Sequence, residues 1–74
     1  MNTDIEVRTI GDEIVAETLE FVREEASGGD EAWLRGYAEG KISVAVVRLG
    51  ADYTKAAAAQ QEIRRLTTAI RSAA

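Results

Sequence analysis

Apolar and polar positions first follow a helical period along this chain. Over about residues 13–26 the apolar side chains recur every three or four positions, which is typical of a helix with one buried face. Asp12 precedes this run and is predicted to cap the helix, because its carboxylate can accept from a free backbone N–H. The glycines within residues 27–29 then end the helix. Residues 1–11, where apolar and polar positions alternate, are predicted to form a flexible N-terminus or an edge strand.

A second, shorter helical pattern covers about residues 31–39. Asp30 is placed to cap the start of this helix, and Gly40 to end it. Trp33 and Tyr37 lie on its apolar side. We expect both side chains in the core, because aromatic residues supply much of the apolar area that small cores bury.

The next segment has a period of two. Ile42, Val44 and Val46 fall on one side of an extended strand, and β-branched residues favour strands. Gly50 then offers the permissive backbone that a tight reversal needs. Residues 41–54 are therefore predicted to form a β-hairpin that turns near Gly50.

About residues 55–72 are predicted to form a long C-terminal helix, because they are rich in alanine, glutamine and arginine and contain no glycine. The predicted fold is a single α+β domain over residues 1–74: a helix, a short helix, a β-hairpin and the long helix. The apolar face of the last helix consists of Ala56, Ala59, Ile63, Leu66 and Ile70. The side chains expected to meet in the core are Phe21, Trp33, Val46, Ile63 and Leu66.

An all-α fold is the alternative. Apolar residues are spaced by seven from Ile42 to Ile70, so residues 41–73 also fit one continuous coiled-coil helix. Gly50 and Asp52 would both lie inside that helix, and both oppose it.

The composition excludes several kinds of chemistry. The chain has 74 residues and contains no cysteine, histidine or proline, so thiol nucleophiles, imidazole bases and the usual zinc ligands are missing. No phosphate-binding glycine motif is present either. We therefore predict a protein that is not an enzyme and that uses no metal and no other cofactor. No apolar stretch approaches the ~20 residues that span a bilayer, so no membrane association is expected.

Charge is distributed unevenly along the chain. Residues 1–40 carry eleven acidic and three basic side chains, a net charge of −8, whereas residues 41–74 carry two acidic and six basic ones, a net charge of +4. Carboxylates at helical spacing form what we call the acidic stripe: Glu13, Glu17, Glu20 and Glu24. A candidate basic face on the C-terminal helix consists of Arg64, Arg65 and Arg71.

Like charges at this spacing repel each other, so the acidic stripe predicts a basic partner. That partner can lie in the basic half of the same molecule, where the pairing would orient the two halves. Otherwise we expect it to be the basic face of a neighbouring copy, in a homo-oligomer, or a separate protein. Direct binding of nucleic acid is not expected, because the whole chain has a net charge of −4.

The order of parts resembles the small head-to-tail joining proteins of tailed bacteriophages, the lambda W type. The resemblance covers about residues 31–72. It depends on a helix that ends at Gly40-Lys41, a strand that reaches Gly50, a return strand and an apolar-spaced closing helix. Short members of that family lack an acidic segment like residues 1–30 and carry a basic C-terminal tail that this chain does not have.

The resemblance implies a ring subunit of a phage connector, bound between the portal and the tail. The alternative hypothesis is a small acidic regulator that binds one protein, such as a phage-encoded inhibitor of a host system or an antitoxin-like partner, through the acidic stripe. Either role predicts a location in the cytoplasm of the host cell or in the virion.

Overall fold

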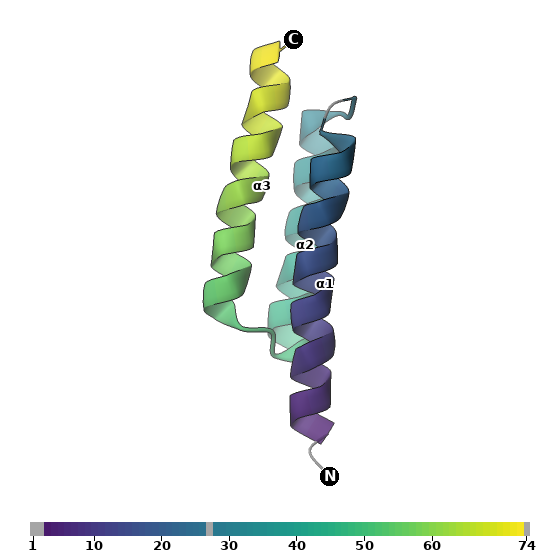
Figure 1. The fold of residues 1–74 in the computed structure, drawn as a ribbon, viewed down its shortest axis with the longest axis vertical. Helices are drawn as coiled ribbons and strands as arrows, with labels where there is room; N and C mark the ends of the chain where they lie inside the picture. Colours follow the sequence, from purple (N-terminus) through teal and green to yellow (C-terminus); the bar gives the residue numbers. More distant parts are fainter. Residues whose placement is uncertain (1–2, 27, 74) are drawn as a thin grey trace.

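The computed structural model describes residues 3–26 and 28–73, with side chains described between residues 5 and 69. The described chain forms three helices and contains no strand: α1 (Thr3–Glu25), α2 (Glu31–Leu49) and α3 (Tyr53–Ala73). They run side by side in alternating directions, each in contact with the other two (Figure 1). The predicted α+β class is therefore wrong, and the all-α class of the alternative is confirmed.

The helix α1 starts earlier than its apolar pattern predicted. Residues 3–10 are helical and form no edge strand, and Asp12 lies inside the helix and does not cap it. The alternation of apolar and polar residues suggested a strand, but Thr9 is also compatible with a helix. Its hydroxyl donates to the Ile5 carbonyl at 2.9 Å. These first turns extend beyond the loop that joins α2 and α3 (Figure 1).

The helix α2 begins as predicted and ends later. The N–H of Trp33 donates to the Asp30 carboxylate at 2.8 Å, which confirms the predicted N-cap. Gly40 does not end the helix, which continues to Leu49. The hairpin predicted over 41–54 is therefore wrong, because its first strand is the second half of α2.

Gly50 does reverse the chain, but it ends a helix and not a strand. Its φ of 69° is left-handed, and its N–H donates to the Val46 carbonyl at 3.2 Å. The N–H of Ala51 donates to the Ala45 carbonyl at 3.0 Å, which completes a helix-closing turn. This turn also excludes the continuous helix over 41–73, since α3 starts anew at Tyr53.

Aliphatic and small side chains make up the core. The predicted inner face of α3 is confirmed at Ala56, Ala59 and Ile63, which are buried, while Leu66 is partly buried. Val46 also packs against the core as expected, but Trp33 does not, since 56% of its surface is exposed. The Ile70 side chain lies outside the described side chains. The buried hydrophobic residues are Val15, Val22, Leu34, Ala38, Ile42, Ala45, Ala51, Ala56, Ala59 and Ile63.

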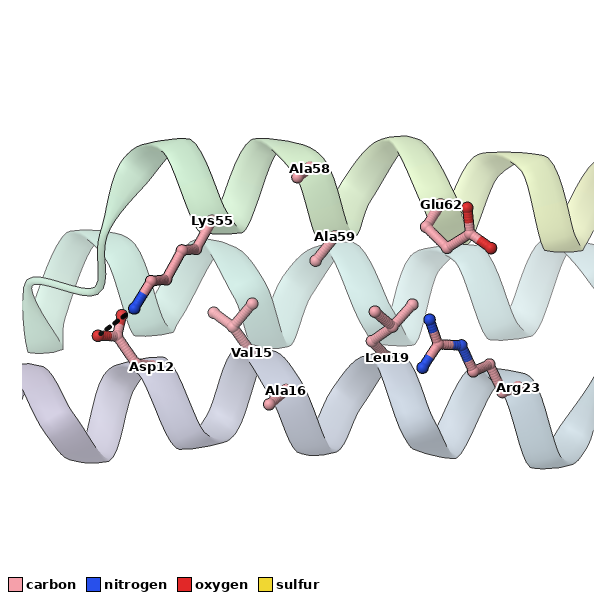
Figure 2. Close-up of a pocket in the computed structure, with 9 residues that line it drawn as sticks. All are labelled: Asp12, Val15, Ala16, Leu19, Arg23, Lys55, Ala58, Ala59 and Glu62. Atoms are coloured by element: carbon pink, nitrogen blue, oxygen red, sulfur yellow. Dashed lines mark ion pairs between the residues drawn. The ribbon is translucent and has the colours of Figure 1, made fainter.

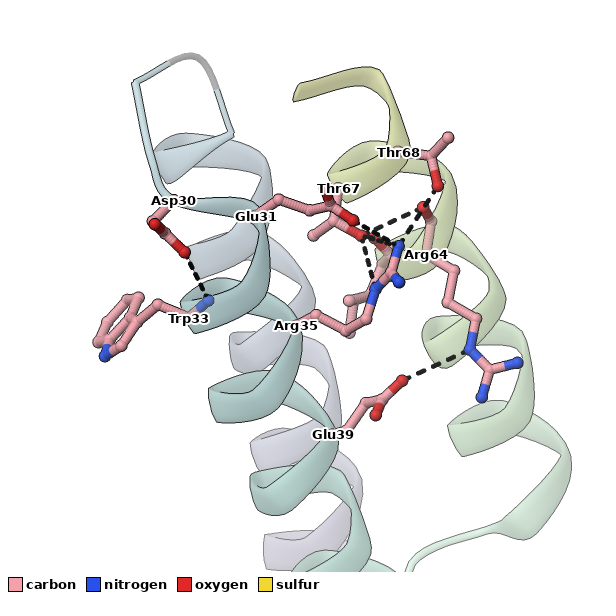
Figure 3. A network of polar contacts seen from close by, with 9 residues as sticks. Asp30, Glu31, Trp33, Arg35, Glu39, Arg64, Thr67 and Thr68 are labelled. Atoms are coloured by element: carbon pink, nitrogen blue, oxygen red, sulfur yellow. Dashed lines mark hydrogen bonds and ion pairs between the residues drawn. The ribbon is translucent and has the colours of Figure 1, made fainter. Parts of the chain in front are cut away.

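A polar clamp joins α2 to α3 at one end of the bundle (Figure 3). The Arg35 guanidinium donates to the Thr67 hydroxyl from Nε at 3.2 Å and from Nη2 at 3.1 Å, and Nη2 reaches Thr68 at 3.3 Å. Glu31 neutralises the same guanidinium at 3.3 Å. Thr67 is fully buried and donates its own proton to the Ile63 carbonyl at 2.8 Å. The clamp therefore satisfies a buried hydroxyl as donor and acceptor, as buried polar groups require.

Candidate functional site

Opposite its buried residues, α2 has a second apolar side, which borders α1 along one edge. Its four large side chains are all exposed, from Tyr37 at 39% and Val44 at 50% to Trp33 at 56% and Val47 at 78%. Their spacing puts them on one side of the helix, together with Gly36 and Gly40. We call this surface the outer face of α2. Its members are Trp33, Gly36, Tyr37, Gly40, Val44 and Val47.

Three aromatic rings meet at the Trp33 end of this face. Trp33 and Tyr37 stack with their ring centroids 5.3 Å apart and their planes at 13°. Phe21 of α1 contacts both, at 5.2 Å from Tyr37 and 6.3 Å from Trp33. The Lys41 ammonium lies 5.5 Å from the centroid of the Tyr37 ring, within the range of a cation–π contact. These contacts hold exposed rings in a fixed arrangement, so little side-chain freedom would be lost if a partner covered them.

Two shallow hollows run along the border between α1 and α2, beside the outer face. One, of about 180 Å³, is lined by residues that include Glu17, Phe21 and Tyr37. The other, of about 240 Å³, is lined by Ile14, Gly40, Lys41 and Val44. The hollows share Ile14 and Lys41, so they form one uneven border of apolar and charged residues that could receive side chains of a partner.

The acidic stripe borders the same surface. All four of its carboxylates are on the exposed side of α1. Glu20 pairs with Arg23 one turn later, whereas no ion pair or hydrogen bond among the described side chains involves Glu13, Glu17 or Glu24. Glu17 lines the hollow next to Phe21, so unpaired negative charge lies directly beside the aromatic rings.

The basic face lies elsewhere and is largely paired within the molecule. Arg64 contacts Glu39 of α2 at 3.4 Å (Figure 3), and Nε of Arg65 donates to Glu62 at 3.0 Å. The hydrogen bond from Arg65 lowers the pKa of the Glu62 carboxyl and raises the pKa of the Arg65 guanidinium. The structure therefore does not bring the acidic stripe to Arg64 or Arg65 within one chain. Arg71 belongs to α3, but its side chain lies outside the described ones.

A separate groove of about 460 Å³ lies between α1 and α3 (Figure 2). Val15, Leu19 and Ala59 form its apolar part. At one end the Lys55 ammonium lies 3.9 Å from Asp12, and at the other Arg23 approaches Glu62 and helps to lower its pKa. Opposite charges thus meet across both ends, so the groove has no uncompensated charge that would select a ligand.

The sequence contained one signal for the outer face that our interpretation missed. Trp33, Tyr37, Val44 and Val47 recur at steps of three, four and seven, as residues on one side of a helix do. Because Gly40 was taken as a helix end, this repeat was divided between a helix and a strand, and Trp33 and Tyr37 were placed in the core.

No group of three metal-ligating side chains occurs in the described part of the chain, and none of its helices is long and apolar enough to cross a membrane. Comparisons of the chain with protein-family models, with curated proteins and with solved structures give no match.

Proposed function

We propose that this protein is a non-enzymatic binding module that holds another polypeptide against the outer face of α2, with the acidic stripe beside the contact. One observation carries the proposal. The inner face of α2 already fills the core with Leu34, Ala38 and Ile42, each fully buried, and yet the helix keeps its largest apolar side chains outside. Those outer side chains contribute little to folding the monomer, so a binding role accounts for them better.

The chemistry of the face is that of a protein interface. Tryptophan and tyrosine dominate the binding energy of many interfaces, because they bury a large area with few rotatable bonds. Trp33 and Tyr37 are held in place by stacking on each other and by the contacts that Phe21 makes with both rings. An apolar surface of this extent is otherwise a liability for a protein in water.

The unpaired carboxylates would orient an approaching partner more than they would strengthen its binding. Exposed ion pairs contribute only about 0–1 kcal/mol each. Glu13, Glu17 and Glu24 would nevertheless attract a basic surface and repel an acidic one during approach. The partner would therefore present an apolar strip with basic residues on the side that meets the stripe.

The small acidic regulator that binds one protein stays a prediction, with which the outer face and the acidic stripe are compatible. The head-to-tail joining role stays a prediction, as does a location in the host cytoplasm or the virion. Its resemblance included a strand pair over residues 41–54, where the structure has the end of α2, a turn and the start of α3. The outer face requires neither a ring nor a capsid, so we assign the binding role without them.

Site-specific photo-crosslinking tests this proposal. A photoreactive amino acid is placed at Val47 on the outer face, and at Gln61, an exposed residue of α3, as the matched control. We expect protein adducts from position 47 in the cells that naturally make the protein, and few from position 61. Equal adducts at both positions, or adducts from position 61 alone, would contradict a role for the outer face.

A further inference from the structure

We propose that the polypeptide held by the outer face is a second copy of this chain. In this dimer α2 packs antiparallel against α2 of the other copy, and the two-fold axis passes beside Gly40. The inference rests on the proposed function, because it names the occupant of the same surface. Three features of α2 support it: the open glycines, the sequence order about Gly40 and the placement of charge.

The first feature is the backbone left bare at the middle of the outer face. Gly40 is the central residue of α2, which runs from Glu31 to Leu49. A Cβ atom added to Gly36 or Gly40 would meet nothing within 4 Å, so the fold of the monomer requires neither glycine. Glycine is a poorer helix former than alanine, yet it lets the backbones of two helices approach closely. Close approach of a helix would explain both residues.

The second feature is self-complementarity. In an antiparallel pair about a two-fold axis, residues equally far from Gly40 on opposite sides face each other. Trp33 then faces Val47 of the second copy, and Gly36 faces Val44 of the second copy. The aromatic end of each outer face would cover the aliphatic end of the other, and the bare glycine would receive a valine side chain. Each contact occurs twice, as a two-fold interface demands.

The third feature is charge. Arg8 and Arg48 line a hollow beside Val47, and no ion pair among the described residues involves either of them. The opposite end of the face, near Trp33, lies beside the acidic end of α1.

This placement of charge also selects the orientation. In an antiparallel pair the basic Val47 end of each outer face lies over the acidic Trp33 end of the other. In a parallel pair the two basic ends would meet, and so would the two acidic ends. A foreign partner would have to supply both a basic and an apolar strip, and the second half of α2 already supplies them.

The oligomeric state of the purified chain is the first test. Sedimentation equilibrium should show a mass that rises with concentration from the 8.0 kDa of one chain to twice that value. Val47→Lys introduces a desolvated charge at the contact and should weaken the dimer at least tenfold. Gln61→Lys makes the same kind of change on the exposed side of α3 and should leave the dimer unchanged.

Cysteine pairing tests the geometry, because the chain contains no cysteine of its own. Disulfides need Cα atoms within ~7 Å of each other. Gly40→Cys should therefore link two copies under mild oxidation, because Gly40 lies at the axis, and Gly36→Cys should not. The double variant Gly36→Cys with Val44→Cys should link them again.

The results of these experiments distinguish the proposed dimer from the broader proposal that the outer face binds a polypeptide. A chain that stays monomeric at every concentration up to its solubility limit overturns the dimer. Adducts between position 47 and a different protein would then still support the binding role. A dimer that tolerates Val47→Lys, or that cross-links equally through Gly36→Cys alone and Gly40→Cys alone, overturns the antiparallel contact at Gly40.

Discussion

The two faces of α2 are both apolar, but they are built from different residues. The inner face is aliphatic and small, with Leu34, Ala38, Ile42 and Ala45 all fully buried. The outer face carries both aromatic residues of the helix and two valines, and keeps between 39% and 78% of their surface exposed. Small inner residues let three helices approach closely, whereas large rings there would hold them apart. Hydrophobicity alone therefore does not show which face of α2 folds the chain, and it is the aromatic rings that distinguish the outer one.

The largest expected effect separates two neighbouring residues of α2 that point to opposite faces. Leu34→Ala should lower the free energy of unfolding by about 2–5 kcal/mol, because it leaves a cavity in the core. Trp33→Ala should cost the monomer only about 0.5–1.5 kcal/mol, the contribution of its ring contacts. Urea unfolding at concentrations where the protein is monomeric measures both. Equal losses would show that the outer face also folds the chain.

Inner and outer positions can also be compared at two glycines, Gly11 of α1 and Gly36 of α2. A Cβ at Gly11 would lie 3.1 Å from the Cβ atoms of Ala51 and Leu49, whereas one at Gly36 would meet nothing within 4 Å. Gly11→Val should therefore destabilise the monomer by about 1–3 kcal/mol through overpacking. Gly36→Ala should stabilise it by up to about 1 kcal/mol through helix propensity. At concentrations where the protein is monomeric, thermal unfolding of the two variants should shift in opposite directions. A shift of the same sign would refute the assignment of inner and outer glycines.

A smaller effect concerns the polar clamp between α2 and α3. Thr67→Val keeps the shape of the side chain but removes the acceptor for Arg35, and should cost about 1 kcal/mol of unfolding free energy. Thr68→Val is the matched control, since Thr68 is exposed and makes only the longer contact of 3.3 Å. Denaturant titration should rank the Thr67 variant well below the control. Similar values for the two would mean that the hydrogen bond from Arg35 to Thr67 adds no measurable stability.

The smallest expected effect is on the exposed pair of Glu62 and Arg65. Because the pKa of Glu62 is lowered in the folded chain, the pair stabilises the protein above the unfolded pKa of about 4.3 and loses that contribution as the pH falls through the lower, folded value. Glu62→Gln should therefore be slightly less stable than the natural chain at neutral pH. The two melting temperatures should converge in acid, once the pH is below the lowered pKa of the folded chain. A difference that persists there would have to come from something other than the carboxylate charge.

The sequence allowed the parts of the fold that depend on local chemistry to be predicted. Asp30 caps α2, Gly50 reverses the chain, and the inner face of α3 contains Ala56 and Ile63, because each effect acts within one or two turns. The spacing of the acidic stripe also put its carboxylates on one side of α1. What the stripe binds stays a prediction.

The hairpin was predicted wrongly because α2 is apolar on two sides. When both faces of a helix carry apolar residues, the helical period is obscured, and the β-branched run from Ile42 to Val47 looks extended. Gly36 and Gly40 strengthened the error, since each weakens a helix by up to about 1 kcal/mol. Packing of Ile42 and Ala45 against α1 and α3 outweighs that cost, and no single sequence window contains those contacts. The outer face itself was missed for the same reason.

The rate of local opening should differ along α1, because its first turns extend beyond the loop between α2 and α3 (Figure 1). Ile5 and Ile10 are half exposed there, whereas Val22 farther along the same helix is fully buried. Amide hydrogens in the first turns can exchange with solvent through local fraying, while those around Val22 must wait for the bundle to open. A protease would likewise meet an unwound peptide bond after Arg8 long before one after Arg23, although both arginines are exposed.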